Sequence, residues 1–198
     1  MKIYLLRHGE TDWNRQEILQ GRTDIPLNSN GKKQAILWSN FFKNINIDII
    51  ISSPLIRARE TADIISKGKN LKQLLIEENF IEKDFGKATG IQKELREKLY
   101  PDRNYEMMET WYNIIQRVSN ALEKYIKIYY QHDILIVCHS SVIKALIQYV
   151  SKESEEIKDK YGINISPLGI TEIEYNSITG YHLVSANKII LDMKGNQL

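Results

Sequence analysis

The sequence predicts a three-layer α/β fold, in which a mostly parallel central sheet carries helices on both faces. Three short segments, residues 3–6, 47–51 and 134–138, are apolar at successive positions and not only at alternate ones. This pattern is typical of parallel strands that are buried on both faces. Segments with helical periodicity lie between them, and strands that alternate with helices indicate an α/β architecture.

Further strands are expected towards the middle and the end of the chain. Weaker candidates lie at 74–77, 171–175 and 181–184. The last two flank the turn-rich sequence NSITG, and two strands joined by such a short connection predict a hairpin.

Helices are expected at 31–43, 54–66, 107–130 and 141–151. The third has the clearest apolar stripe, with the i, i+3, i+4, i+7 spacing of one helix face. Its members are Trp111, Ile114, Ile115, Val118, Leu122, Tyr125, Ile126 and Tyr129. In the second helix, Ser53 suits the N-cap and Pro54 the first helical position, which places Arg57 about one turn into the helix.

The composition is that of an ordinary globular protein, with 42% hydrophobic and 26% charged residues, and 198 residues suit a single domain over 1–198. The net charge of +2 argues against a protein that coats nucleic acid, but it allows a local basic pocket. With Cys138 as the only cysteine, no internal disulfide is possible, and no Cys/His spacing suggests zinc. Apolar runs are too short for a membrane span, and no signal peptide is visible, so we expect a cytoplasmic protein.

Polar side chains follow three of the predicted strands. Arg7 and His8 follow the first strand, the segment 52–57 follows the second, and His139 to Ser141 follow the strand at 134–138. In open α/β sheets, ligands bind outside the carboxyl ends of the strands. We therefore expect these three segments to form one site.

The chemistry of these segments indicates an anion. Burying two adjacent cationic or potentially cationic groups costs several kcal/mol unless a negative charge compensates them. Arg57 adds a guanidinium beside one helix N-terminus, and Ser140 or Ser141 is expected to cap another, so free N–H groups point the same way. Gly9 is expected to allow close approach of a ligand or a positive φ. Two arginines, two histidines and two helix N-termini at one place predict a phosphate site that needs no metal ion.

Taken singly, each segment also has a simpler explanation. The Arg7–His8 pair can be an ordinary polar loop, Arg57 can be solvated, and an isolated histidine such as His139 is more often structural than catalytic. A fourth segment, ENFIEKDFGKATG, offers the carboxylates Glu77, Glu78, Glu82 and Asp84, one of which can be the acid that phosphate chemistry needs.

The ordered combination of these motifs resembles the histidine phosphatase superfamily, in its phosphoglycerate mutase-like branch. The matching motifs span most of the chain. They are LRHGETDWN at 6–14, LQGRTDIPLNSNGKKQA at 19–35, SSPLIRARETA at 52–62, EKDFG at 82–86 and VCHSS at 137–141.

The resemblance implies a role for each site residue. His8 would be the nucleophile that becomes phosphohistidine, and Glu82 would protonate the leaving oxygen. The groups that grip the phosphoryl oxygens would be Arg7, Arg57 and His139. The groups that line the substrate side would be Asn14, Gln20, Gly21 and Ser140. Arg7 would also keep His8 neutral by lowering its pKa through like-charge repulsion.

These roles favour a metal-independent, cofactor-independent phosphomonoester hydrolase acting on a small phosphorylated metabolite. Alternatives are a phosphoglycerate mutase, a catalytically silent binding module of the same fold, and a cysteine phosphatase using Cys138, where Lys144 stands at the position that needs arginine. The substrate stays open among sugar phosphates, intermediates of cobalamin synthesis, phosphoserine and phosphoglycerates.

The segment 100–111 forms either a lid or ordinary core, with core favoured for Met107, Met108 and Trp111. No membrane or nucleic-acid partner is expected, and the oligomeric state stays open.

Overall fold

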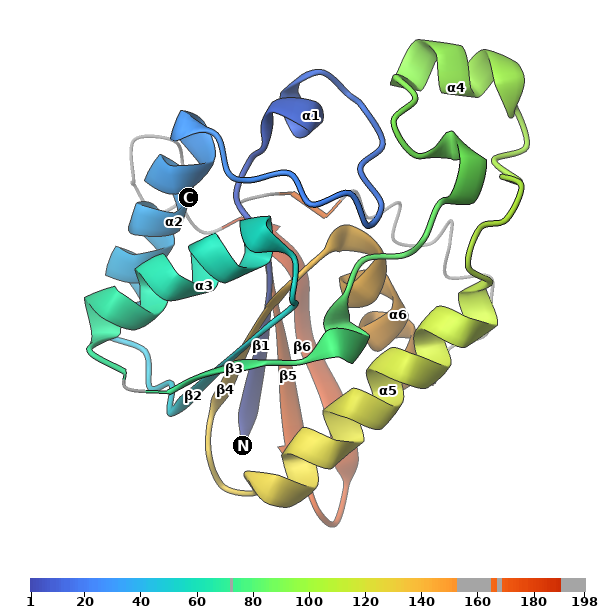
Figure 1. The fold of residues 1–198 in the computed structure, drawn as a ribbon. Coiled ribbons are helices and arrows are strands. Elements are labelled where there is room, and N and C mark those ends of the chain that lie inside the picture. Colours follow the sequence, from blue (N-terminus) through green and yellow to red (C-terminus); the bar gives the residue numbers. More distant parts are fainter. Residues whose placement is uncertain (72, 153–164, 167–168, 190–198) are drawn as a thin grey trace.

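The computed structural model describes residues 1–71, 73–152, 165–166 and 169–189, and its centre is a six-stranded sheet in the order β3-β2-β4-β1-β5-β6 (Figure 1). The strands are β1 (Lys2–Arg7), β2 (Ile49–Ser52), β3 (Leu74–Ile76), β4 (Ile134–Cys138), β5 (Gly169–Asn176) and β6 (Gly180–Ile189). Strands β3, β2, β4 and β1 run parallel, and β5 and β6 form the antiparallel end of the sheet. The predicted strands and the hairpin are confirmed.

Helices cover both faces of this sheet, with α2 and α3 on one side and α5 and α6 on the other (Figure 1). The α-helices are α1 (Asp12–Arg15), α2 (Ser29–Phe42), α3 (Ile56–Lys69), α4 (Lys93–Leu99), α5 (Trp111–Ile128) and α6 (Ser140–Ser151). Two 3-10 turns are η1 (Glu78–Phe80) and η2 (Gly86–Ala88). The three-layer α/β prediction is confirmed. That the whole of 1–198 forms one domain stays a prediction.

Strand β1 shows why the buried strands are apolar at successive positions. Ile3 and Leu5 belong to the core under α5 and α6. Tyr4 and Leu6 point to the other face and pack with α2 and α3. Because side chains alternate along a strand, both faces are buried only if neighbouring residues are all apolar.

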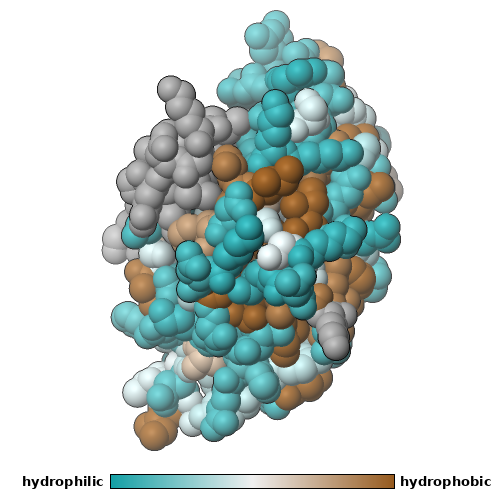
Figure 2. Space-filling view, turned by 90° about the vertical axis from the view of Figure 1, so that its left-hand side faces the viewer, coloured by the Kyte–Doolittle hydropathy of each residue, from teal (hydrophilic) through white to brown (hydrophobic). Residues whose placement is uncertain are grey.

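The surface on the side of α2 and α3 is mostly polar. Figure 2 shows the side of the molecule that lies on the left in Figure 1, where α2 and α3 lie, and hydrophilic side chains prevail there with smaller hydrophobic areas between them. Within the described part of the chain, no helix is both long enough and apolar enough to cross a membrane.

Two helices begin later than predicted, whereas α2 and α6 begin one or two residues earlier. Helix α5 begins at Trp111 instead of 107, because Met107 has a positive φ of 61° and the Thr110 side chain caps the helix by accepting from the Asn113 N–H. Helix α3 begins at Ile56 instead of 54. Its first amide is capped from a distant loop, by Asp24 Oδ1 at 2.6 Å.

Candidate active site

The loops that follow β1, β2 and β4 meet at one edge of the sheet, as predicted. Arg7 pairs in register with Cys138, so the two strands end side by side. Beyond them, the His8 N–H donates to the Cys138 carbonyl at 3.1 Å, and the Ser53 N–H donates to the Val137 carbonyl at 3.0 Å. The sheet thus fixes the positions of the predicted site residues before any side chain interacts.

His8 is held as a neutral imidazole with one nitrogen available. Its Nδ1 lies 2.7 Å from the Gly9 carbonyl, which can only accept, so Nδ1 carries the proton and Nε2 keeps its lone pair. Burial lowers the pKa of His8 well below its ordinary value, and the nearby Arg57 and Arg7 lower it further. Repulsion by Arg7 was the expected cause, whereas burial is the larger one. At neutral pH His8 has the properties of a nucleophile.

His139 lies beside His8, with the two ring centroids 5.1 Å apart, and it is fully buried. Its Nε2 lies 2.7 Å from the Ser53 hydroxyl, while its Nδ1 is buried with no partner among the described residues. Burial lowers its pKa too, followed by the charge of Arg57. The prediction that Ser140 or Ser141 caps α6 is wrong, because His139 itself occupies the N-cap position.

Ser53 has a different role from the predicted helix cap. Its hydroxyl orients the His139 ring and accepts from the Leu55 N–H at 3.3 Å, in the turn before α3. Because Leu55 is extended, α3 starts later and Arg57 falls in its first turn.

Arg57 is a buried cation at the centre of the site, only 1% exposed. It donates to the carbonyls of Thr23 and Gly21, both at 2.8 Å, and its Nε has no partner in the described structure. Burial lowers its pKa to about 10, although Glu82 opposes the change, so the guanidinium is charged at neutral pH.

Arg7, like Arg57, donates to a backbone carbonyl and has a buried Nε without a partner among the described residues. The acceptor is the Ile165 carbonyl at 2.6 Å, and burial lowers the pKa of Arg7. Among the described residues, no carboxylate forms an ion pair with either arginine. Leaving buried charges uncompensated is strongly destabilising.

Unpaired buried donors therefore concentrate at one place. Five buried side-chain atoms of the described chain lack a hydrogen-bond partner, and three of them belong to Arg7, Arg57 and His139. Since buried polar groups are normally satisfied, a cluster of such exceptions calls for an explanation. An oxyanion that accepts from these groups and neutralises the arginines is the simplest one.

Gly9 is needed for packing and not for a positive φ. A Cβ at Gly9 would lie 2.5 Å from the carbonyl oxygen of Gly31 in α2, which is closer than real Cβ atoms come. The Gly9 N–H also donates to the Thr61 hydroxyl at 3.1 Å. The expected close approach is thus to the protein's own backbone.

Among the four candidate carboxylates, Glu82 is the one that lines a cavity beside Arg7. Its Oε1 accepts from the Lys83 N–H at 2.8 Å, which leaves the second oxygen for a proton transfer. Glu77 is engaged by Lys124 at 2.7 Å, and Asp84 accepts from the Gly86 N–H. The structure therefore separates one candidate acid from carboxylates with structural partners.

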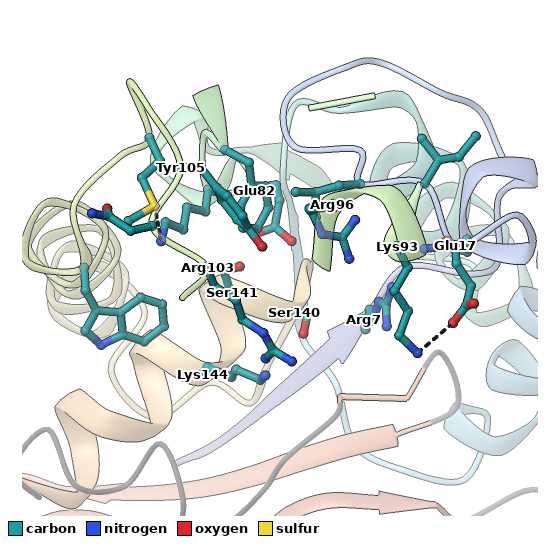
Figure 3. A pocket seen from close by; sticks show the side chains of 18 of the residues that line it. Arg7, Glu17, Glu82, Lys93, Arg96, Arg103, Tyr105, Ser140, Ser141 and Lys144 are labelled. Atoms are coloured by element: carbon teal, nitrogen blue, oxygen red, sulfur yellow. Dashed lines mark hydrogen bonds and ion pairs between the residues drawn. The ribbon is translucent and has the colours of Figure 1, made fainter. Parts of the chain in front are cut away.

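The cavity has a volume of about 960 Å³ and opens beside Arg7 (Figure 3). Asn14 and Ser140 line it, as the substrate-side assignment requires. Gln20 and Gly21 are buried and lie outside its lining, and the Gly21 carbonyl instead holds Arg57.

The segment 100–110 forms a wall of this cavity. Tyr105, Met108 and the following Trp111 line it, whereas Met107 is 82% exposed. The core assignment is therefore wrong for Met107. Arg103 and Lys144 line the same cavity, although neither was predicted as a residue of the phosphate site.

The cysteine alternative fails on burial. Cys138 is fully buried in β4, and burial raises the pKa of its thiol. A nucleophilic cysteine needs an accessible, stabilised thiolate, which this environment opposes.

The two buried histidines predict a pH-dependent stability. Their pKa values are low in the folded state and near 6.5 in the unfolded chain, so the unfolded state binds more protons below pH 6.5. The free energy of unfolding should therefore fall below that pH, with about 1.4 kcal/mol per pH unit from each histidine. Urea denaturation between pH 7.5 and 5 should show a shallower dependence for His139→Gln than for the wild type. An unchanged slope would contradict a neutral buried His139.

Comparisons with known proteins show which family and fold the chain shares. The family model described as "Histidine phosphatase superfamily (branch 1)" matches residues 3–188. The protein called uncharacterized phosphatase PhoE of Bacillus subtilis is 40% identical over 162 residues, which cover 82% of this chain and 83% of that protein. Phosphoserine phosphatase 1 of Hydrogenobacter thermophilus is 31% identical over 157 residues, or 74% of each chain. The solved structure of a mutant phosphoserine phosphatase from Entamoeba histolytica with phosphoserine has a TM-score of 0.81 and 27% identity, covering 95% of this chain and 97% of that one.

Proposed function

The chain belongs to the histidine phosphatase superfamily, branch 1, and from that premise we propose that its phosphatase site consists of His8, Arg7, Arg57, His139 and Glu82. The observation that carries this proposal is the set of unpaired buried donors around the available Nε2 of His8. A phosphoryl group satisfies these donors and brings phosphorus to the nucleophile.

The first chemical step transfers the phosphoryl group to the protein. His8 Nε2 attacks phosphorus, a P–N bond forms, and the P–O bond to the leaving group breaks. Glu82, protonated at this stage, gives its proton to the leaving oxygen. Negative charge on the phosphoryl oxygens is stabilised by the two guanidiniums and His139, which are already oriented by backbone carbonyls and Ser53.

The second step returns the protein to its starting state. Glu82, now a carboxylate, takes a proton from water, whose oxygen attacks phosphorus while the P–N bond breaks. Inorganic phosphate leaves, and Glu82 is protonated again. Two arginines supply the positive charge that a metal ion provides in other phosphatases, which supports a metal-independent reaction.

Water access favours hydrolysis over a mutase reaction. A mutase must keep water from the phosphohistidine. Here the cavity wall includes exposed side chains such as Lys93, Arg103 and Asn104, so the cavity is connected to solvent. A silent binding module is disfavoured because both the nucleophile and the acid are present and oriented.

The test is a panel of small phosphomonoesters assayed for phosphate release in EDTA. We expect turnover in EDTA that added magnesium does not increase, and free phosphate instead of phosphate migration with 3-phosphoglycerate. Loss of all activity in EDTA that magnesium restores would contradict the metal-independent mechanism. Conversion of 3-phosphoglycerate to its 2-isomer without phosphate release would favour the mutase.

A further inference from the structure

Two cations in the cavity, Lys144 and Arg103, are not part of the phosphoryl-binding group. Lys144 lies one turn after Ser140 on α6, and Arg103 lies between α4 and α5. Figure 3 shows their side chains next to each other on the side of the cavity near Ser140 and Ser141. The charges of Arg7 and Arg103 both lower the pKa of Lys144, in keeping with this placement.

The other cations of the cavity wall already have partners. Lys93 pairs with Glu17 at 3.3 Å, and Arg96 donates to the Ile91 carbonyl at 3.1 Å. Lys83 lies over two aromatic rings, 5.6 and 5.8 Å from their centroids. These three side chains are thus engaged in holding the wall together.

Lys144 and Arg103 differ because, among the described residues, none forms a hydrogen bond or an ion pair with their side chains. Both side chains line the cavity and are exposed to the solvent in it. Partial loss of solvent lowers the pKa of Lys144, and the charge of Glu82 opposes this change. Solvent screens part of the repulsion between the two cations, and an anion bound between them would remove the rest.

In the described structure, the cavity's own carboxylates form no ion pair with Lys144 or Arg103. Glu82 is the proposed proton donor, and Asp102 accepts from the Asn104 N–H at 3.0 Å instead of contacting either cation. Glu10 accepts from the Asn28 side chain at 2.8 Å, on the far side near α2. The anion that Lys144 and Arg103 are arranged to bind must therefore come with the ligand.

We infer that Lys144 and Arg103 form a second anion subsite, and that the substrate is a phosphomonoester carrying a further carboxylate or phosphate. This inference rests on the proposed function, since the first phosphoryl group is placed by Arg7 and Arg57. The N-terminal turn of α6, with Ser140 and Ser141 lining the cavity between the two sites, suits a ligand that spans both.

The test compares two substrates of nearly equal shape, 3-phosphoglycerate and glycerol 3-phosphate, which differ by a carboxylate in place of a hydroxymethyl group. The wild type should have the higher kcat/KM for 3-phosphoglycerate. Lys144→Met should lower kcat/KM for it about 10- to 100-fold, as expected for losing a hydrogen bond to a charged group, and leave glycerol 3-phosphate nearly unchanged. Lys144→Arg should retain the preference, and Arg103→Gln should reduce it.

The matched control is Lys33→Met, which removes the same charge from the exposed surface of α2. It should leave both substrates unaffected. A sugar bisphosphate in the same assay distinguishes a second phosphate from a carboxylate as the preferred anion. Equal rates of the wild type on all these compounds, or equal losses in Lys144→Met, would overturn the subsite.

A binding measurement separates this inference from the proposed function. In His8→Ala, which cannot turn substrate over, calorimetry should show tighter binding of 3-phosphoglycerate than of glycerol 3-phosphate, and Lys144→Met in that background should remove the difference. If this holds while the wild type releases no phosphate, the hydrolase proposal fails and the subsite stands. If the wild type hydrolyses both compounds alike and neither binds preferentially, the subsite alone fails.

Discussion

Replacing His8 with alanine is expected to abolish phosphomonoester hydrolysis, with kcat at least about 10⁴-fold below the wild type. The reason is that the whole first step depends on the lone pair of Nε2, which the Gly9 carbonyl leaves available by holding the proton on Nδ1. His139 cannot substitute, because its Nε2 is engaged with Ser53. Steady-state phosphate release, measured with substrate in excess, checks the loss.

The same prediction has a covalent signature. In Glu82→Gln the acid and base function is lost, both steps slow down, and a phosphorylated protein should persist with a good leaving group such as 4-nitrophenol. Rapid-quench mass spectrometry should find the added phosphoryl group on His8, and acid should remove it. The double variant with His8→Ala should show none.

Matched replacements of other residues control for general damage. His132→Ala removes an exposed histidine outside the cavity and should leave kcat unchanged. Cys138→Ser changes the buried thiol, so it can reduce stability but not the chemistry. Full turnover by His8→Ala, or its loss in Cys138→Ser with the fold intact, would refute the assignment of the nucleophile.

The central strands of the sheet were predictable because the signal for each strand lies within a few consecutive residues. Double-sided burial requires successive apolar residues, and β1, β2 and β4 all have them. Helix α5 was predictable for the opposite reason. Only one of its faces is buried, so its apolar residues recur with helical spacing. Helix starts were less accurate: the cap of α3 comes from Asp24, more than thirty positions earlier, and no local pattern reports such a contact.

The centre of the site was predictable because parallel strands end at one edge of a sheet. His8, Arg57 and His139 each follow such a strand, so topology alone brings them together. The roles of Ser53 and Gly9 were not predictable from the sequence. They depend on contacts with residues distant in the chain, His139 for Ser53 and the Gly31 backbone for Gly9.

Of the two cations in the proposed second anion subsite, Lys144 was predictable from the sequence and Arg103 was not. Lys144 could have been found, because it lies four residues after Ser140 and therefore on the same face of a helix whose first turn was already assigned to the site. Arg103 could not, since it belongs to an irregular segment and has a positive φ of 56°. Nothing in the local sequence predicts where such a residue points.

Replacing Arg57 with lysine is expected to lower kcat about 10²- to 10³-fold although the charge is kept. The guanidinium donates to the Gly21 and Thr23 carbonyls, and its buried Nε has no partner among the described residues, so we expect it to donate to the phosphoryl group. A lysine has one nitrogen and cannot satisfy two carbonyls and a phosphoryl oxygen in the same fixed geometry. A carbonyl left without its donor should also reduce the free energy of unfolding, by about 1–3 kcal/mol.

Arg59→Lys is the matched control, because it makes the same change on the same helix at an exposed position. Activity, urea denaturation and binding of inorganic phosphate by calorimetry should be measured for both variants. For Arg57→Lys, phosphate binding should weaken along with kcat at temperatures where the variant is fully folded, whereas Arg59→Lys should match the wild type. If Arg57→Lys lost stability but kept its kcat and its phosphate affinity, Arg57 would be a structural cation, and the unpaired donors around His8 would need another explanation.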